Sequence, residues 1–246
     1  MRVLLTDHTV DPVTAIERAA ANCYDSEPSP DGKIMNACYE SGHHSVLEFA
    51  DFTFHIEGVS RALLAQLSRH RMMSLCVRSQ RYCSEDGFEN ITPKTILNNK
   101  DTLKLYDDIT VHIQDSYSEL LKLNIPAEDA RMVLPNSCET VIECKMNLRE
   151  LIHFCNLRLC TRAQDEIREL ANAMKNLVLY KVDIPLYGKE MISKYLVPKC
   201  EVNIKYPFCT EKKGCGRHKK LQEIYEGYEK HMKTMEDVEN AGRKYN

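Results

Sequence analysis

The sequence predicts an α+β fold in which a mixed or antiparallel sheet is flanked by long helices. Residues 46–57 alternate between apolar and polar side chains, as a half-buried strand does. Residues 101–123 instead repeat apolar side chains at helical spacing, which predicts a long amphipathic helix. No internal repeat or low-complexity linker divides the chain. We therefore expect one domain over residues 1–195, followed by a Cys-containing loop and a charged helix over residues 196–246.

Local signals place the remaining elements in chain order. Asp11-Pro12 begins a helix that runs to Asn22, because proline is favoured in the first helical turn. Gly42 ends a helix that begins near Gly32. Residues 69–90 have no clean period and are rich in Arg, Ser, Met and Cys, which is typical of a functional loop. The other expected elements are strands over residues 3–6 and 140–145, helices over residues 60–68, 126–134, 148–159, 163–180 and 219–239, and a polar stretch after Pro185.

Composition excludes several classes of protein. The chain has 33 basic and 36 acidic residues and a net charge of −3, so it lacks the broad basic surface of a duplex nucleic-acid binder. Its first residues lack the apolar core of a signal peptide, and no apolar run reaches membrane-spanning length. Its 11 cysteines are scattered through expected core elements, which favours reduced thiols. We expect a cytoplasmic protein that binds neither nucleic acid nor a membrane.

Five basic groups lie within thirteen residues of the central loop, interleaved with serines. They are Arg69, His70, Arg71, Arg78 and Arg81. Guanidinium groups are permanently charged, forked donors that match phosphate oxygens, and serine hydroxyls can supply further hydrogen bonds. The cluster therefore indicates a phosphate-binding site. On composition alone, a solvated basic loop or an RNA-contacting arm remains an alternative.

The spacing within this cluster resembles a known motif. Arg69-His70-Arg71 is followed after seven residues by Ser79, and then by Gln80-Arg81-Tyr82. This pattern resembles the signature of the flavin-dependent thymidylate synthases. The resemblance implies that Arg69, His70 and Arg71 contact the flavin cofactor. It also implies that Ser79 and Arg81 hold the phosphate of the nucleotide substrate, with Arg69 close to both ligands.

Further segments between about residue 20 and residue 185 share this resemblance. Ser41 to Phe49 is similar to the family's His-rich turn, Ala130 to Pro135 to a nucleotide-binding element, and Asn147 to Arg168 to a third element. Gln66 lies three residues before Arg69, so both would share one face if the helix continued. The resemblance implies two more groups of ligand contacts. They are substrate contacts at Gln66, Arg131 and Arg158, and flavin contacts at His43, Ser45, Asn147, Arg149 and His153.

The resemblance implies one reaction. Deoxyuridylate (dUMP) would receive a one-carbon unit from 5,10-methylenetetrahydrofolate, and FAD reduced by NADPH would supply a hydride to give thymidylate (dTMP). Arg158 would be the catalytic residue, since a fixed cation stabilises negative charge on the pyrimidine. The family is homotetrameric, so we expect active sites that are shared between subunits. No metal is expected in them.

One departure from the family pattern leaves an alternative open. Cys76 and Val77 stand where family members often have Asn and Glu, so a carboxylate is lost. A flavin-binding relative that acts on a different pyrimidine nucleotide is therefore an alternative. Cysteine catalysis is disfavoured, because neither Cys76 nor Cys83 has an identifiable base nearby in the sequence, and Cys138 does not directly follow a proline.

A series of potential metal ligands lies outside the family core. Cys200, Cys209, Cys215 and His218 have the spacing C-x8-C-x5-C-x2-H, and three thiols with one imidazole can complete a tetrahedral zinc site. The paired C-x2-C knuckle is missing, however, and Pro207, Gly214 and Gly216 indicate a turn-rich loop. Free thiols in a surface appendage are the expectation, with structural zinc as the alternative.

Overall fold

The computed structural model describes residues 1–242, with side chains to residue 235, and it contains one four-stranded sheet. Every pairing in the sheet is antiparallel. The spatial order is β1 (Arg2–His8), β2 (Asp51–Ser60), β4 (Glu139–Asn147) and β3 (Met73–Val77). The predicted α+β class is confirmed, and the sheet is antiparallel rather than mixed.

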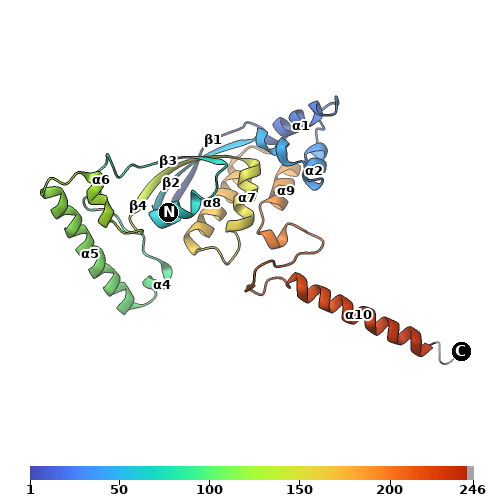
Figure 1. The fold of residues 1–246 in the computed structure, drawn as a ribbon. Helices are drawn as coiled ribbons and strands as arrows, with labels where there is room; N and C mark the ends of the chain where they lie inside the picture. Colours follow the sequence, from blue (N-terminus) through green and yellow to red (C-terminus); the bar gives the residue numbers. More distant parts are fainter. Residues whose placement is uncertain (243–246) are drawn as a thin grey trace.

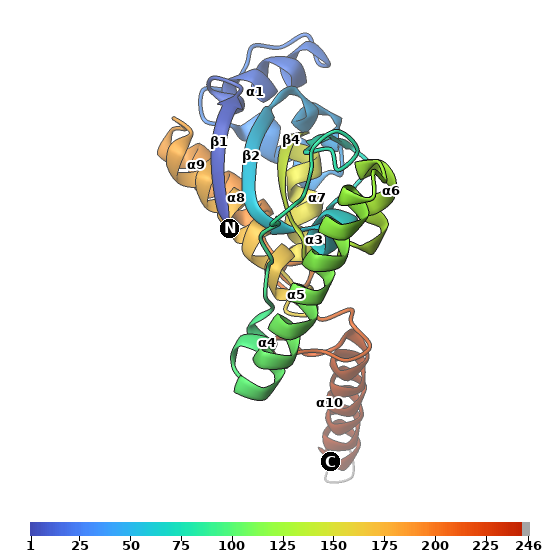
Figure 2. The ribbon, with the colours of Figure 1, turned by 90° about the vertical axis from the view of Figure 1, so that its left-hand side faces the viewer.

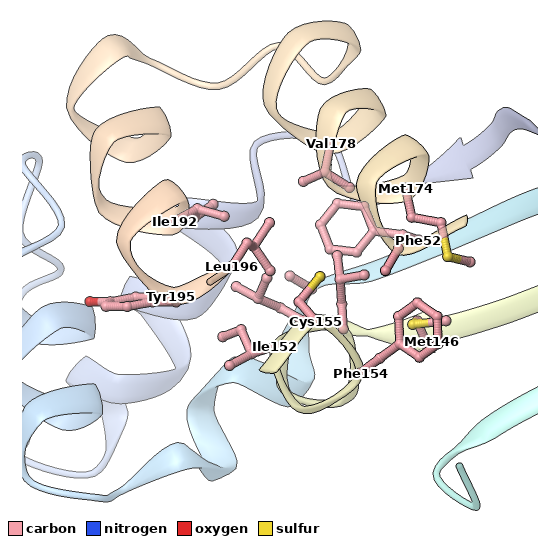
Figure 3. Packing of buried hydrophobic residues seen from close by; sticks show 14 of the residues in the cluster. Phe52, Met146, Ile152, Phe154, Cys155, Met174, Val178, Ile192, Tyr195 and Leu196 are labelled. Atoms are coloured by element: carbon pink, nitrogen blue, oxygen red, sulfur yellow. The ribbon is translucent and has the colours of Figure 1, made fainter. Parts of the chain in front are cut away.

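Three helices cover one face of the sheet, as Figure 2 shows. They are α3 (Arg61–Leu67), α7 (Leu148–Arg158) and α8 (Asp165–Lys181). Phe52, Phe54 and Ile56 of β2 all point to this side and are fully buried, as their alternation predicted. In Figure 3 the ring of Phe52 lies beside side chains of α7 and α8. Burial of each such side chain contributes about 1.5–3 kcal/mol.

The predicted helix ends are confirmed by their caps. The side chain of Asp11 accepts a hydrogen bond from the backbone N–H of Thr14 and so caps α1 (Pro12–Asn22). Ser60 caps α3 in the same way, at 3.0 Å from the N–H of Leu63. Gly42 follows α2 (Lys33–Glu40) with a φ of 80°, a backbone conformation that favours glycine.

The structure differs from the sequence-based expectation in several segments. The first residues of the strand expected over 46–57 belong instead to a short 3₁₀ helix, η1 (His44–Phe49), which buries Val46 and Leu47 under neighbouring helices. The expected loop over 69–90 contains strand β3. The expected polar stretch after Pro185 contains α9 (Leu186–Tyr195), which buries Ile192 and Tyr195 in the core.

Further helices stand beyond the β3 edge of the sheet (Figure 1). They are α4 (Lys94–Leu97), α5 (Lys100–Lys122), α6 (Ala127–Ala130) and the 3₁₀ turn η2 (Arg131–Val133). The long helix α5 is as predicted, but the helix expected over 126–134 is two short turns. Tyr117 is the α5 side chain that is fully buried, whereas Leu105 and Ile109 are 62% and 48% exposed.

The chain leaves the core after α9. A short turn, η3 (Lys199–Glu201), and an irregular loop lead to α10 (Leu221–Gly242), which projects away from the rest of the protein (Figure 1). Residues 243–246 of the expected appendage lie outside the described residues. Among the residues that are described, no helix combines the length and the apolar character needed to cross a membrane.

Candidate active site

A buried histidine links the two ends of α7 to the end of α3. His70 is only 5% exposed, and its Nε2 accepts a hydrogen bond from Nε–H of Arg158 over 2.9 Å. Because arginine can only donate, Nδ1 must carry the ring proton. Nδ1 lies 3.3 Å from the Oε1 of Glu150 and donates to it. Glu150, His70 and Arg158 therefore form one hydrogen-bonded chain.

Local structure at α7 positions both partners of His70. Glu150 lies in the first turn, where its backbone N–H is capped by the side chain of Asn147 at 2.9 Å. Arg158 lies in the last turn and also donates to the backbone carbonyl of Gln66 over 3.1 Å. These two bonds use two of the five guanidinium hydrogens, so three remain to donate to a ligand. Partial burial lowers the pKa of Arg158 from its ordinary value.

The predicted flavin contacts lie around the hydrogen-bonded set of Glu150, His70 and Arg158. The ring of His153 lies 5.7 Å from that of His70, and η1, with His43 just before it and Ser45 within it, packs against α7. Arg149 pairs with Glu48 of η1 at 2.5 Å. The remaining predicted contacts are Asn147, which caps α7, and the exposed side chains of Arg69 and Arg71, which flank His70 in the sequence. The structure therefore brings the predicted flavin contacts to one end of the sheet.

The predicted phosphate contacts form a second group at the far end of β3. The Oγ of Ser79 accepts a hydrogen bond from the backbone N–H of Arg81 over 3.2 Å, which closes the turn after the strand. The Nε of Arg81 donates to a carboxylate oxygen of Glu128 at 3.0 Å. The Nε of Arg131 donates to the backbone carbonyl of Glu128 at 3.1 Å. Ser79, Arg81 and Arg131 therefore meet around α6.

Within a single chain, the predicted flavin contacts near α7 and the predicted phosphate contacts around α6 remain apart. β3 separates His70 from Ser79, and five strand residues span about 16 Å. No hydrogen bond or ion pair among the described side chains joins Arg158 to Arg131. Gln66 belongs to the first group, with its side-chain amide donating to Gln164 at 2.6 Å. Arg69 lies beyond α3, which ends at Leu67, so the expected shared helix face with Gln66 is not formed.

Comparison with known proteins decides the family. A family model described as thymidylate synthase complementing protein matches residues 4–182, well over half of the chain. A flavin-dependent thymidylate synthase of Geobacter sulfurreducens is 43% identical over 190 residues, which cover 72% of this chain and 82% of the relative. Another, from Clostridium tetani, is 37% identical over 251 residues, covering 92% of this chain and 97% of the relative. The chain belongs to the flavin-dependent thymidylate synthase family.

Solved structures of flavin-dependent thymidylate synthase from Helicobacter pylori share the fold. One, in complex with FAD and dUMP, has a TM-score of 0.58 and 28% identity, covering 72% of this chain and 93% of that chain. A second, also with FAD and dUMP, has a TM-score of 0.61 and 27% identity, covering 80% of this chain and 99% of that chain. The family reaction, and so that of this enzyme, is the FAD-dependent methylation of dUMP to dTMP.

The departures from the flavin-dependent thymidylate synthase motif lie on β3. Val77 pairs with Ile142 of β4 and packs against the core, so its side chain contributes apolar contacts at this position. Cys76 is exposed on the other face, opposite Glu143. The motif's carboxylate is thus replaced by packing at Val77.

Three buried thiols of this enzyme are poor nucleophiles. Burial raises the pKa of Cys138 to about 11 and the pKa values of Cys144 and Cys155 to about 12. A thiol with such a pKa stays protonated near neutral pH, whereas cysteine catalysis needs the thiolate. These values agree with a thymidylate synthase that uses flavin rather than a cysteine nucleophile.

A large cavity of the enzyme lies elsewhere and does not suit an anionic ligand. It has a volume of about 500 Å³ and opens beside α4 and the start of α8. Asp165, Glu166 and Glu169 line it, and its one cation, Lys94, is paired with Glu169. Like charges would repel the phosphates of dUMP or FAD. The cationic groups at the two ends of β3 are the better candidates.

Sequence reasoning missed the acids that orient the cations. Glu150 is 5% exposed and holds His70, while Glu48 pairs with Arg149 and Glu128 with Arg81. The pattern Asn147-x-x-Glu150 signals a helix start, at which the glutamate usually returns to the backbone. Here its side chain turns to His70 instead. Only the three-dimensional approach of α3 to α7 reveals this role.

Proposed function

We propose that this enzyme takes its one-carbon unit from 5,10-methylenetetrahydrofolate and its electrons from NADPH. Overall, dUMP, methylenetetrahydrofolate, NADPH and a proton give dTMP, tetrahydrofolate and NADP⁺. The new carbon is bonded to C5 of the pyrimidine, which loses its hydrogen as a proton, and a hydride completes the methyl group. Bound FAD supplies the hydride chemistry. No nucleophile of the protein takes part.

The observation that supports a reaction without a protein nucleophile is the guanidinium of Arg158, which is held by Gln66 and His70 with three N–H donors left for a ligand. C5 becomes nucleophilic as negative charge moves onto the pyrimidine oxygens, and a preorganised cation stabilises that charge. Arginine keeps its charge at working pH, because even a lowered pKa starts from a value above 12. Arg158 is thus proposed as the catalytic residue.

The chemistry of the residues fits FAD at the α7 end of the sheet. Its diphosphate is anionic, and the N-terminus of the eleven-residue helix α7 carries the exposed donor Arg149 in its first turn. We assign to FAD the residues named from the motif. They are His43, Ser45, Arg69, His70, Arg71, Asn147, Arg149 and His153. Because both ring nitrogens of His70 are engaged, His70 would present its ring edge and position Arg158 rather than donate a hydrogen bond.

The phosphate of dUMP is proposed to bind Ser79, Arg81 and Arg131. Arg81 and Arg131 offer forked donors on either side of Glu128, and the Ser79 hydroxyl proton is available because its oxygen only accepts from Arg81. Gln66 and Arg69, at the other end of β3, would meet the same nucleotide. A second copy of the chain is needed for this, since one chain separates the groups.

We also propose a homotetramer with shared active sites, which the separation of the two groups within one chain supports. Exposed apolar side chains on α5, among them Leu105 and Ile109, form a surface that a neighbouring subunit could bury. Two further proposals remain from the sequence. They are a cytoplasmic location and a division into a catalytic domain over residues 1–195 and an appendage over residues 196–246.

One experiment tests the proposed co-substrates. Purified enzyme reconstituted with FAD should convert dUMP to dTMP only when both methylenetetrahydrofolate and NADPH are added. Parallel assays replace dUMP with its cytidine counterpart or its 5-hydroxymethyl counterpart. They test whether the enzyme acts on a different pyrimidine nucleotide, the alternative that the missing carboxylate at Val77 leaves open. Protein that cannot bind FAD, or that binds oligonucleotides in a salt-sensitive way without forming dTMP, would contradict the proposal.

A further inference from the structure

The loop between α9 and α10 is held together by very few apolar contacts. From Lys199 to Lys220, the one buried residue is Cys209, at 9% exposure, and the regular structure is limited to η3 and a single bridge between Cys209 and Lys220. A segment of this length without a core is not stabilised by hydrophobic burial. Small irregular units of this kind usually depend on a disulfide or a metal.

The same loop concentrates metal-binding groups around one small cavity. The cavity has a volume of about 40 Å³, and its walls include four thiols and one imidazole. These belong to Cys160, Cys200, Cys209, Cys215 and His218. Cys160 comes from the turn between α7 and α8, so the sequence spacing did not place it here. All five side chains have lone pairs suited to Zn²⁺.

The geometry at His218 is that of a metal ligand with a supporting acid. A thiol of Cys200, a carboxylate oxygen of Glu201 and a ring nitrogen of His218 lie within 4.8 Å of one another. The Nε2 of His218 lies 3.3 Å from Oε1 of Glu201. If Nε2–H donates to this carboxylate, Nδ1 is left to bind a cation, which is the usual arrangement at zinc-bound histidines.

We propose that this cavity binds a structural Zn²⁺ ion through Cys200, Cys209, Cys215 and His218. Three thiols lose their protons on binding, and three thiolates with Zn²⁺ carry one net negative charge. Arg162, Lys199 and Arg217 line the same cavity together with Glu211, and Arg217 pairs with Glu201, so the surroundings keep a net positive charge that offsets the charge of the site. Gly214 and Gly216 flank Cys215, and Gly216 has a φ of 86°, so the backbone can turn the exposed Cys215 towards the ion. Cys160 forms the core side of the cavity without being required as a ligand.

The zinc would fix the start of α10 against the catalytic domain. Cys160 lies two residues after Arg158, so the metal-bound loop would rest on the turn that follows the proposed catalytic helix. This inference is independent of the proposed co-substrates, because the ligands lie outside both groups of the candidate active site. The enzyme could thus lose zinc and keep its FAD.

Metal content of the full-length enzyme tests the proposal. We expect about one zinc per chain by elemental analysis of protein purified under reducing conditions with zinc in the medium. The reduced, metal-free enzyme should bind Co²⁺ with the visible bands of a tetrahedral thiolate site. Less than about a tenth of a zinc per chain together with no Co²⁺ bands, or a disulfide among these cysteines, would overturn the proposal.

Single substitutions test the ligand set. Cys200→Ser, Cys209→Ser, Cys215→Ser and His218→Ala should each weaken zinc binding at least about tenfold, as measured by competition with a chelator. Cys160→Ser, in the same cavity, and Cys23→Ser, exposed after α1, should retain zinc. Loss of zinc in Cys160→Ser with retention in Cys215→Ser would overturn the assignment. Bound FAD serves as the folding control for every variant.

Discussion

The Nε–H of Arg158 donates to Nε2 of His70 over 2.9 Å, so the direction of a guanidinium depends on the tautomer of a buried ring. That tautomer is in turn fixed by Glu150, which accepts from Nδ1. A cation, an imidazole and a carboxylate from two segments of the chain thus act as one unit. Each link can be removed by a single substitution.

Arg158→Lys should lower kcat by about 10²- to 10³-fold, which is the usual cost of losing one preorganised donor. Lysine keeps the charge but has no fork with which to engage both His70 and the carbonyl of Gln66. Flavin absorbance of the purified variant should be unchanged, and Arg158→Ala should bind FAD with almost no turnover. Arg18→Lys, on an exposed face of α1, is the matched control. Parallel loss of FAD and of turnover would show that Arg158 is misassigned.

Glu150→Gln should separate charge from hydrogen bonding. Glutamine can still accept a hydrogen bond from His70, but it has no negative charge with which to favour the arrangement of His70 and Arg158. We therefore expect kcat to fall about tenfold, while KM for dUMP changes little. Stability should fall by about 1–3 kcal/mol in urea unfolding. Glu40→Gln, which is exposed, is the control. Lower stability with unchanged kcat would mean that Glu150 only supports the fold.

Ser79→Ala should weaken nucleotide binding but leave turnover at saturating dUMP nearly unchanged. A hydrogen bond to a charged phosphate contributes about 1.5–3 kcal/mol, so KM for dUMP should rise about 10- to 100-fold. At saturating dUMP the kcat should stay within about threefold of the parent enzyme. Ser74→Ala, exposed on β3, provides the comparison. An inactive enzyme at saturating dUMP would assign Ser79 to the chemical step instead.

The sequence alone predicts the parts of this enzyme whose signals are local. Alternation at Phe52 and Phe54, the cap at Asp11 and the helical period of α5 each depend on near neighbours in the chain, and the structure confirms all three. β3 was missed because a strand of five residues is flanked by arginines that hide its alternation. α9 was missed because its burial depends on contacts with distant elements, such as that of Gly188 with Val13.

The candidate site divides in the same way. The motif around Arg69 to Arg81 names the cations, but it contains no signal for Glu150, Glu128 or Glu48, which determine where those cations point. Arg69, Arg131 and Arg158, which the resemblance assigns to one substrate, lie in two separate groups within one chain. In the proposed assembly a second copy of the chain would complete the site, and local sequence patterns carry no information about such long-range contacts.

Alkylation should distinguish exposed thiols from buried ones. Burial raises the pKa of Cys138 to about 11, so at about pH 8 it should stay protonated and unmodified by iodoacetamide. The exposed Cys23, Cys76 and Cys83 should react before Cys138, as peptide mass spectrometry would record. Cys138→Ser should retain turnover. An inactive Cys138→Ser enzyme that still binds FAD would reopen the question of a cysteine nucleophile.

The pH dependence of stability should reveal a charged network on the solvent face of the sheet. His55 of β2 contacts Glu143 of β4 and Glu57 of its own strand, and the hydrogen bonds to Glu143 and Glu57 raise its pKa. Arg2 of β1 completes the network through Glu57. A histidine whose folded pKa is raised stabilises the protein fully below its unfolded pKa of about 6.5, and this stabilisation is lost as pH rises through the folded value.

The unfolding midpoint in urea should therefore differ more between parent enzyme and His55→Gln at about pH 6 than at about pH 9. Above the raised folded pKa the ring is neutral in both the folded and the unfolded state, so little remains for the substitution to remove. His112 lies on the exposed face of α5 and forms no ion pair with an acidic group among the described side chains. The control substitution His112→Gln should therefore show no such trend. A difference that stays constant, or that grows with pH, would mean that His55 contributes through packing and not through its charge.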